Sequence, residues 1–346
     1  MPGEFDLIAR HFTRPHRRGR ALLGVGDDCA LLAPARGALA VSTDMLLEGR
    51  HFFPEVDPES LGHKALAVNL SDLAAMGAHP VAFTLALALP QATDDWLSRF
   101  ARGLFDLADA HACELVGGDT TRGPLSLCIT VMGEVDPVRA LRRDGARAGD
   151  ELWVSGDLGG AAWAVAHRQA SGGWARPQGL TSALFEAAQE RLHRPLPRVT
   201  LGKALAGLAS AAIDLSDGLC GDLGHVLARS SQACGHGLTA QIALDQLPLH
   251  PVLGSLPLEQ QWRLALAGGD DYELLFSAPV SRRSELQALA ARLALPLTRI
   301  GQIEPVRQGA HDHEADRLRL IDAHGRAVSM TLQAHDHFSD HASRHE

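Results

Sequence analysis

The chain has 346 residues, of which 46% are hydrophobic and 21% are charged, so it has enough apolar material for a sizeable core. Its formal net charge of −9 leaves no broad basic face, so nucleic acid is not an expected partner. No stretch approaches the roughly 18 apolar residues that span a bilayer, and the N-terminal residues show no signal-peptide pattern. We therefore expect no membrane segment.

The five cysteines are few and unevenly spaced. An odd number without a C-x-x-C pair argues against a disulfide framework and against a zinc ribbon. We expect reduced cysteines in a cytoplasmic protein. The cysteines are Cys29, Cys113, Cys128, Cys220 and Cys234.

The first half of the chain alternates helical and extended patterns. Asp57 and Pro58 predict a helix start, with the aspartate as N-cap and the proline in the first helical position. Hydrophobic spacing predicts helices over 4–12, 58–77 and 94–111, and strands over 38–42, 81–89, 114–116 and 125–135.

Residues 139–150 are rich in Arg, Gly and Asp, and they predict a domain boundary. We expect an N-terminal domain over 1–138, a C-terminal domain over 149–338 and a polar tail over 339–346. The alternation of strands and helices predicts a mixed α/β class. In the second half we predict strands over 151–155, 211–215 and 272–277, helices after Gly160 and over 217–230, 258–266 and 284–293, and a loop over 171–181.

The segment 24–28, Gly-Val-Gly-Asp-Asp, begins like a dinucleotide-binding turn. Cys29 stands where the third glycine of that fingerprint would be. Asp27 and Asp28 would repel a pyrophosphate unless a divalent cation lay between them. The segment therefore favours a metal-bridged phosphate, with a plain glycine turn as the alternative.

Two further polar groups lie within apolar surroundings. Ser42, Thr43 and Asp44 are predicted at the end of a strand, and Asp72 lies inside the 58–77 helix. Apolar residues crowd both sides of that helix. An aspartate there is costly unless it is paired or coordinated to a metal.

Three later segments combine acids with glycine at predicted strand junctions: 117–123, 214–218 and 268–273. Each signal is weak alone, because Asp and Gly are common in turns. Together they indicate hard oxygen ligands for Mg²⁺, Ca²⁺ or Mn²⁺ rather than for zinc. The sequence has no EF-hand spacing, no G-x-x-x-x-G-K-[ST] loop and no protein-kinase signature.

Taken in order, these motifs resemble the thiamine-monophosphate kinase family, within the superfamily of aminoimidazole ribonucleotide synthetase and selenide, water dikinase. The segments that carry the resemblance are GVGDDCALL, STDMLLEGRHF, KALAVNLSDLAAMGA, GGDTTRGPL, AIDLSDGL and GGDDYEL. The resemblance implies a two-domain PurM-like fold of the α/β (α+β) kind. It also implies a homodimer in which strands of the two N-terminal domains form a barrel at the interface, with a separate C-terminal α/β domain.

The resemblance also implies roles for individual residues. At two substrate positions the chain departs from the family: Asp270 replaces the usual glutamate, and His335 replaces an aromatic residue that often precedes Asp-His-Phe. Metal ligands are implied at Asp27, Asp28, Ser42, Thr43, Asp44, Asp72, Asp119, Asp214 and Asp217; ATP contacts at Gly118, Asp119, Arg143 and Ser216; and substrate contacts at His51, Asp270 and His335.

The implied reaction is the last step of thiamine diphosphate biosynthesis, in which ATP phosphorylates thiamine monophosphate with the help of several Mg²⁺ ions. The acceptor is a phosphate whose second pKa is about 6, so no catalytic base and no covalent nucleophile are expected. Direct in-line transfer is our hypothesis. The alternatives are another ATP-using enzyme of the superfamily, such as the aminoimidazole ribonucleotide synthetase or the selenide kinase, and a non-catalytic sensor of ATP and magnesium.

Overall fold

The structure is a computed structural model that describes residues 4–14, 20–25, 29–306, 318–330 and 332. The chain divides into two compact units. The first contains the residues up to Leu141 together with 193–207, and the second contains 142–192 and the residues from Leu208 onward. The segment 193–207 lies within the range predicted for the C-terminal domain.

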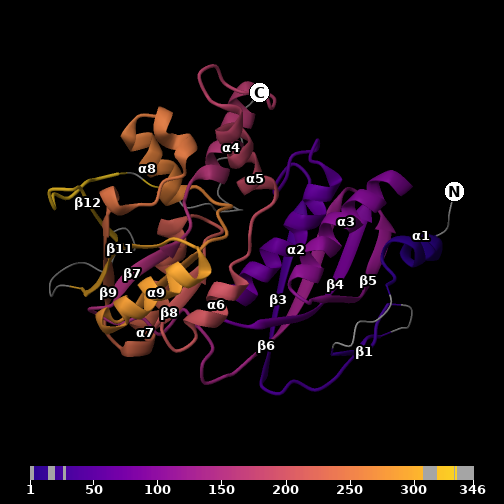
Figure 1. The fold of residues 1–346 in the computed structure, drawn as a ribbon, viewed down its shortest axis with the longest axis horizontal. Helices are drawn as coiled ribbons and strands as arrows, with labels where there is room; N and C mark the ends of the chain where they lie inside the picture. Colours follow the sequence, from indigo (N-terminus) through magenta and orange to yellow (C-terminus); the bar gives the residue numbers. More distant parts are fainter. Residues whose placement is uncertain (1–3, 15–19, 26–28, 307–317, 331, 333–346) are drawn as a thin grey trace. The chain divides into compact units, whose positions relative to one another are not determined.

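A four-stranded sheet with helices on one face forms the centre of the first unit (Figure 1). The strand order is β3-β6-β4-β5, in which only β4 and β5 are parallel neighbours. In the described residues no sheet closes into a barrel. The elements of this unit are α1 (Glu4–His11), β1 (Ala21–Leu23), β2 (Leu31–Leu32), β3 (Ala38–Leu47), α2 (Pro58–Ala75), β4 (His79–Leu89), α3 (Asp94–Ala110), β5 (Glu114–Arg122), β6 (Ser126–Val135) and α6 (Val199–Leu205).

Helix α2 is buried on nearly all sides. It contacts α3 and α6 as well as β3, β4 and β6, which explains why apolar residues crowd its whole circumference. Its start is the predicted one, because the carboxylate of Asp57 accepts a hydrogen bond from the N–H of Ser60 at 3.0 Å. The contact with α3 is close: a Cβ at Gly103 would lie 1.8 Å from the carbonyl oxygen of Glu59.

The two faces of the sheet differ. Along β6, Leu127, Ile129 and Val131 are buried and alternate with half-buried residues. On β3, which is an edge strand, Val41 and Met45 are 57% and 56% exposed. One face therefore carries the helices, and the other presents apolar side chains to solvent.

The second unit is built on a six-stranded sheet in the order β12-β9-β11-β7-β10-β8. All neighbouring strands are antiparallel except β12 and β9. Val154, Ile213 and Leu275 lie in its core. The elements are β7 (Glu151–Ser155), α4 (Gly160–Ser171), α5 (Ser182–His193), β8 (Ala211–Asp214), α7 (Leu219–Cys234), β9 (Leu238–Ala243), η1 (Leu244–Gln246), η2 (Pro251–Ser255), α8 (Leu258–Ala267), β10 (Leu274–Ala278), η3 (Val280–Arg282), α9 (Arg283–Leu293), β11 (Leu297–Pro305) and β12 (Leu318–Ile321).

Two predicted strand ends are wrong. β3 continues three residues past Asp44 to Leu47, and β5 continues past Asp119 to Arg122. Both strands keep a paired neighbour over this extra length, β6 for β3 and β4 for β5. The motifs at 42–44 and 117–119 therefore lie within strands and not at strand ends or junctions.

All five cysteines are free thiols. Within the described residues, no helix has both the length and the apolar character that crossing a membrane requires.

Candidate active site

In the first unit, β3 and α2 bring three of the predicted site residues together. The hydroxyl of Ser42 donates a hydrogen bond to the carboxylate of Asp72, one turn before the end of α2. The backbone N–H of Asp44 donates to the side-chain oxygen of Asn69 at 3.1 Å. The polar residues inside the apolar helix thus face the strand that carries Ser42 and Asp44.

Two other predicted residues, Asp119 and Thr43, lie on the opposite face of the same sheet. Asp119 pairs with Ala86 of β4, Ala86 pairs with Cys128 of β6, and Cys128 pairs with Met45 of β3. Paired residues share a face and consecutive residues alternate, so Asp119 lies on the face of Met45, opposite that of Asp44.

Thr43 shares the face of Asp119, and its hydroxyl lies 2.8 Å from that of Thr130. The predicted ligands of this unit therefore fall into an inner set, formed by Ser42, Asp44 and Asp72, and an outer set, formed by Thr43 and Asp119.

Two further predicted residues of this unit, Gly118 and His51, have local structural roles. Gly118 has φ +149°, and a Cβ there would lie 1.8 Å from the carbonyl oxygen of Leu85 in β4. Only glycine allows this approach of the two strands. His51 follows β3, and its Nδ1 accepts a hydrogen bond from the N–H of Leu47 at 3.0 Å.

In the second unit, the turn between β8 and α7 gathers carboxylates. Asp214 ends β8 and is buried. The N–H groups of Ser216 and Asp217 donate to the carboxylate of Asp222, at 3.1 and 3.2 Å. Burial, with the added charges of Asp214 and Asp217, raises the pKa of Asp222 to about 8.

Asp222 was not predicted as a site residue. It lies in the first turn of α7 and is buried. Like Asp72, it is an acid within a helix that has many apolar residues, and the sequence carries that signal. Its interactions make it an acceptor for the turn that carries Ser216 and Asp217.

The 268–273 segment lies directly against this turn. The N–H of Asp270 donates to the carbonyl of Ser216 at 3.0 Å, and the N–H of Tyr272 donates to the carbonyl of Leu215 at 2.8 Å. The Tyr272 hydroxyl donates to the carboxylate of Asp270 at 3.1 Å. The predicted substrate residue Asp270 thus lies beside the predicted nucleotide residue Ser216.

Arg143 lies near the start of the second unit, and its side chain is exposed. Its backbone carbonyl accepts a hydrogen bond from the Ser230 hydroxyl at 2.9 Å, which ties the segment to α7. The neighbouring Arg142 forms an ion pair with Asp144.

The remaining predicted residues, Asp27, Asp28 and His335, lie outside the described residues. In the part of the chain that the structure describes, no three His, Cys, Asp or Glu side chains are grouped so that they could hold a metal ion. What the structure supplies is two regions rich in oxygen donors, one in each unit.

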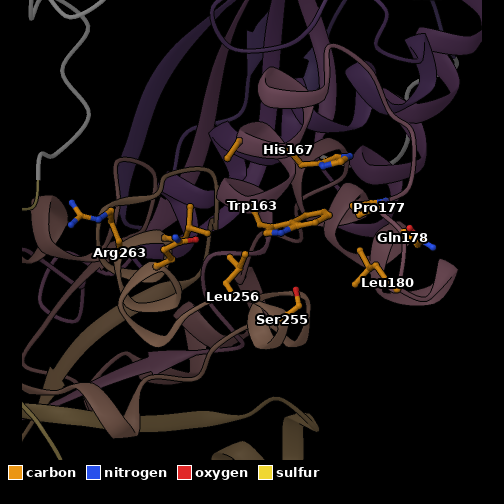
Figure 2. Close-up of a pocket in the computed structure, with 12 residues that line it drawn as sticks. Trp163, His167, Pro177, Gln178, Leu180, Ser255, Leu256 and Arg263 are labelled. Carbon is orange, nitrogen blue, oxygen red and sulfur yellow. The ribbon is translucent and has the colours of Figure 1, made fainter.

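A separate cavity of about 590 Å³ opens in the second unit, between α4, the 172–181 loop and α8 (Figure 2). The rings of Trp163 and His167 stack in its lining with centroids 5.1 Å apart. No described site residue from the sequence analysis lines it, and its lining has no carboxylate. Cavity size alone would favour it as a ligand site, but the oxygen donors needed for phosphoryl transfer lie elsewhere.

Comparison with known proteins gives a consistent result over nearly the whole chain. The family "AIR synthase related protein, N-terminal domain" matches residues 26–135. The chain is 44% identical to thiamine-monophosphate kinase of Escherichia coli (strain K12) over 340 residues, which is 97% of this chain and 98% of the relative.

Solved structures agree. The crystal structure of thiamine-monophosphate kinase from Stenotrophomonas maltophilia K279a has a TM-score of 0.79 at 46% identity, and the match covers 90% of this chain and 93% of that one. The structure of AaThiL complexed with AMPPCP and TMP has a TM-score of 0.69 at 29% identity, covering 86% and 87%. The chain belongs to the thiamine-monophosphate kinase family.

Proposed function

We propose that the chain transfers the terminal phosphoryl group of ATP to thiamine monophosphate, giving ADP and thiamine diphosphate. The observation that carries this function is the 44% identity to a thiamine-monophosphate kinase over 97% of the chain. The AaThiL complex with AMPPCP and TMP supports the same pair of substrates.

Within this proposal, the adjoining loops of the second unit receive both substrates. Ser216 contacts the nucleotide and Asp270 contacts thiamine monophosphate, and the hydrogen bond between their backbones supports placing acceptor and donor side by side. Gly118, Asp119 and Arg143 complete the nucleotide contacts, with the exposed guanidinium of Arg143 directed to phosphate. His51 and His335 complete the substrate contacts.

The donor sets of both units fit magnesium by their chemistry. Carboxylate and hydroxyl oxygens are the ligands that Mg²⁺ prefers, and the carboxyl groups of Asp214 and Asp217 close to Asp222 support a concentration of negative charge at this turn. Bound Mg²⁺ would neutralise the repulsion between two polyanionic substrates, which for unit charges at about 4 Å costs roughly 4 kcal/mol at an effective dielectric of 20. The proposed ligands are Asp27, Asp28, Ser42, Thr43, Asp44, Asp72, Asp119, Asp214 and Asp217.

The protein's own contribution is to hold and orient the reactants. The acceptor phosphate is ionised near neutral pH, so no side chain has to remove a proton from it. We propose direct in-line transfer without a phosphorylated enzyme. A phosphorylated side chain trapped during turnover would contradict this mechanism.

The proposal includes a homodimer joined through the first unit. Strand β3 is an edge strand, and its exposed residues include Leu39, Val41 and Met45. Exposed apolar side chains beside an open strand edge are typical of an interface. A second copy would cover this face, and the sheets of the two copies would together form the expected barrel.

Two broader expectations belong to the same proposal. The five free cysteines support a cytoplasmic location. The division of the chain between Leu141 and Arg142 supports a boundary between the domains proposed at 1–138 and 149–338.

The decisive experiment is a coupled assay of ADP release. We expect ADP to appear only when ATP, thiamine monophosphate and Mg²⁺ are all present, and EDTA to abolish it. Thiamine diphosphate identified by mass spectrometry would confirm the product. Saturable ATP binding without ADP release would instead indicate a sensor.

A further inference from the structure

The 268–273 segment has an unusual backbone. Asp270 has φ +67° and Tyr272 has φ +48°, both in the left-handed region. Residues with a Cβ rarely adopt this conformation, and they keep it only where surrounding contacts enforce it. Two such residues within three positions need strong restraint.

One side of the segment is held by the turn after β8. In addition to the bonds from Asp270 and Tyr272 already described, the N–H of Leu215 donates to the carbonyl of Glu273 at 2.9 Å. These backbone bonds join the segment to the turn that carries Ser216.

The other side is held by two buried acids that alternate with Asp270 and Tyr272. The carboxylate of Asp271 accepts a hydrogen bond at 3.0 Å from the N–H of Gly159, at the start of α4. The carboxylate of Glu273, which is 0% exposed, accepts one from the Ser155 hydroxyl at 2.5 Å. The acids therefore hold the segment to β7 and α4 from within the unit.

Arg191 of α5 closes this internal network. Its Nη2 donates to the carboxylate of Glu273 at 2.6 Å and to the backbone carbonyl of Asp157 at 2.9 Å. Its side chain is only 15% exposed. The space is tightly filled, because a Cβ at Gly156 would lie 2.1 Å from the Glu273 carboxylate.

We propose that Arg191 is a positioning residue for the kinase reaction, acting with Glu273 to hold the left-handed segment so that the Asp270 carboxylate faces thiamine monophosphate. This inference rests on the proposed function, because it takes Asp270 as a substrate contact. Arg191 touches neither substrate, and it acts by fixing the backbone between Asp270 and Glu273.

The test is the double variant Arg191→Met/Glu273→Gln. It removes both charges of the Arg191–Glu273 pair, the new glutamine can still accept from Ser155, and Asp271 keeps its hydrogen bond from Gly159. We expect a folded protein whose KM for thiamine monophosphate rises on the order of 10- to 100-fold, with a smaller change in kcat. Arg191→Lys keeps the charge and should retain a KM near that of the wild type.

A matched control is the pair formed by Glu151 and Arg283 in the same unit. Glu151 is also buried and paired with arginine, but it lies at the opposite end of β7 from Ser155. Arg283→Met/Glu151→Gln should lower the melting temperature without changing the KM.

The variant Asp270→Asn distinguishes a failure of the positioning role of Arg191 from a failure of the substrate role of Asp270. If Arg191 acts through Asp270, then Asp270→Asn raises the KM, and adding Arg191→Met/Glu273→Gln raises it little further. If Asp270→Asn raises the KM but the folded double variant Arg191→Met/Glu273→Gln has the KM of the wild type, only the positioning role of Arg191 is overturned. An unchanged KM in Asp270→Asn overturns the substrate role of Asp270 and the positioning role with it.

Discussion

At the scale of single residues, Asp72 is a half-buried acid within a largely apolar helix. A carboxylate among apolar residues is costly unless it has a partner, and the Ser42 hydroxyl on β3 donates a hydrogen bond to that of Asp72. Apolar surroundings make a negative charge on the Asp72 carboxylate costly when no cation is bound. The same surroundings strengthen the attraction between that carboxylate and a bound cation. Local packing and proposed function thus depend on one side chain.

We predict that Asp72→Asn lowers the rate of ADP release by at least about 100-fold, the order of effect of losing one preorganised electrostatic contact. The amide has the same shape and can still accept from Ser42, so the melting temperature should change little. Asp322→Asn, at an acid paired with Arg326 in the second unit, is the matched control and should retain full activity. Full activity in Asp72→Asn would remove Asp72 from the site.

The candidate site could be predicted from the sequence where the signal is local. The acid inside the 58–77 helix required a partner, and the structure supplies one in Ser42. The placement of Asp119 could not be predicted, because its face depends on the register of β5 against β4, which is set by contacts far apart in the sequence. Asp222 carries the same local signal as Asp72, an acid within a helix that has many apolar residues.

At the scale of elements, boundaries marked by strong local chemistry were predicted well. The α2 start at Asp57 and Pro58 is confirmed, and β7 has the predicted bounds Glu151–Ser155. β3 and β5 extend further than predicted, because pairing with neighbouring strands outweighs the weak strand preference of acids and glycines. Several elements were not predicted, among them α5, α6, β9, β11 and β12.

Helix α2 also gives a prediction on pH. His63 is buried in it, and its Nε2 donates to the carbonyl of Pro195 at 2.9 Å. Burial lowers the pKa of His63 below its usual value of 6.5. As pH falls through about 6.5, the unfolded chain takes up the proton first, so the free energy of unfolding should decrease.

Urea unfolding measured between about pH 7 and pH 5 would test this. His63→Gln has no titrating group in that range, so its stability should fall less steeply with decreasing pH than that of the wild type. His324→Gln, at an exposed position, should leave the slope unchanged. An identical slope in His63→Gln and wild type would show that His63 does not contribute.

At the scale of the whole molecule, the exposed face of β3 predicts association. We expect light scattering to give the mass of a dimer for the wild type and of a monomer for Val41→Lys, because a lysine would place charge in a buried apolar interface. Val138→Lys is a matched control at a valine that is 91% exposed on a loop, and it should remain dimeric. A monomeric wild type would contradict the proposed interface.

The return of residues 193–207 to the first unit has a consequence for how the chain can be divided. Helix α6 lies so close to α2 that a Cβ at Gly202 would be 1.9 Å from the carbonyl oxygen of Ala74. A fragment ending at Leu141 would lose this cover and leave that side of α2 facing water. A protease cut within the loop at 172–181 would have a different result, since each unit would then contain parts of both pieces. The two pieces should therefore stay together without a covalent link and separate only in denaturant.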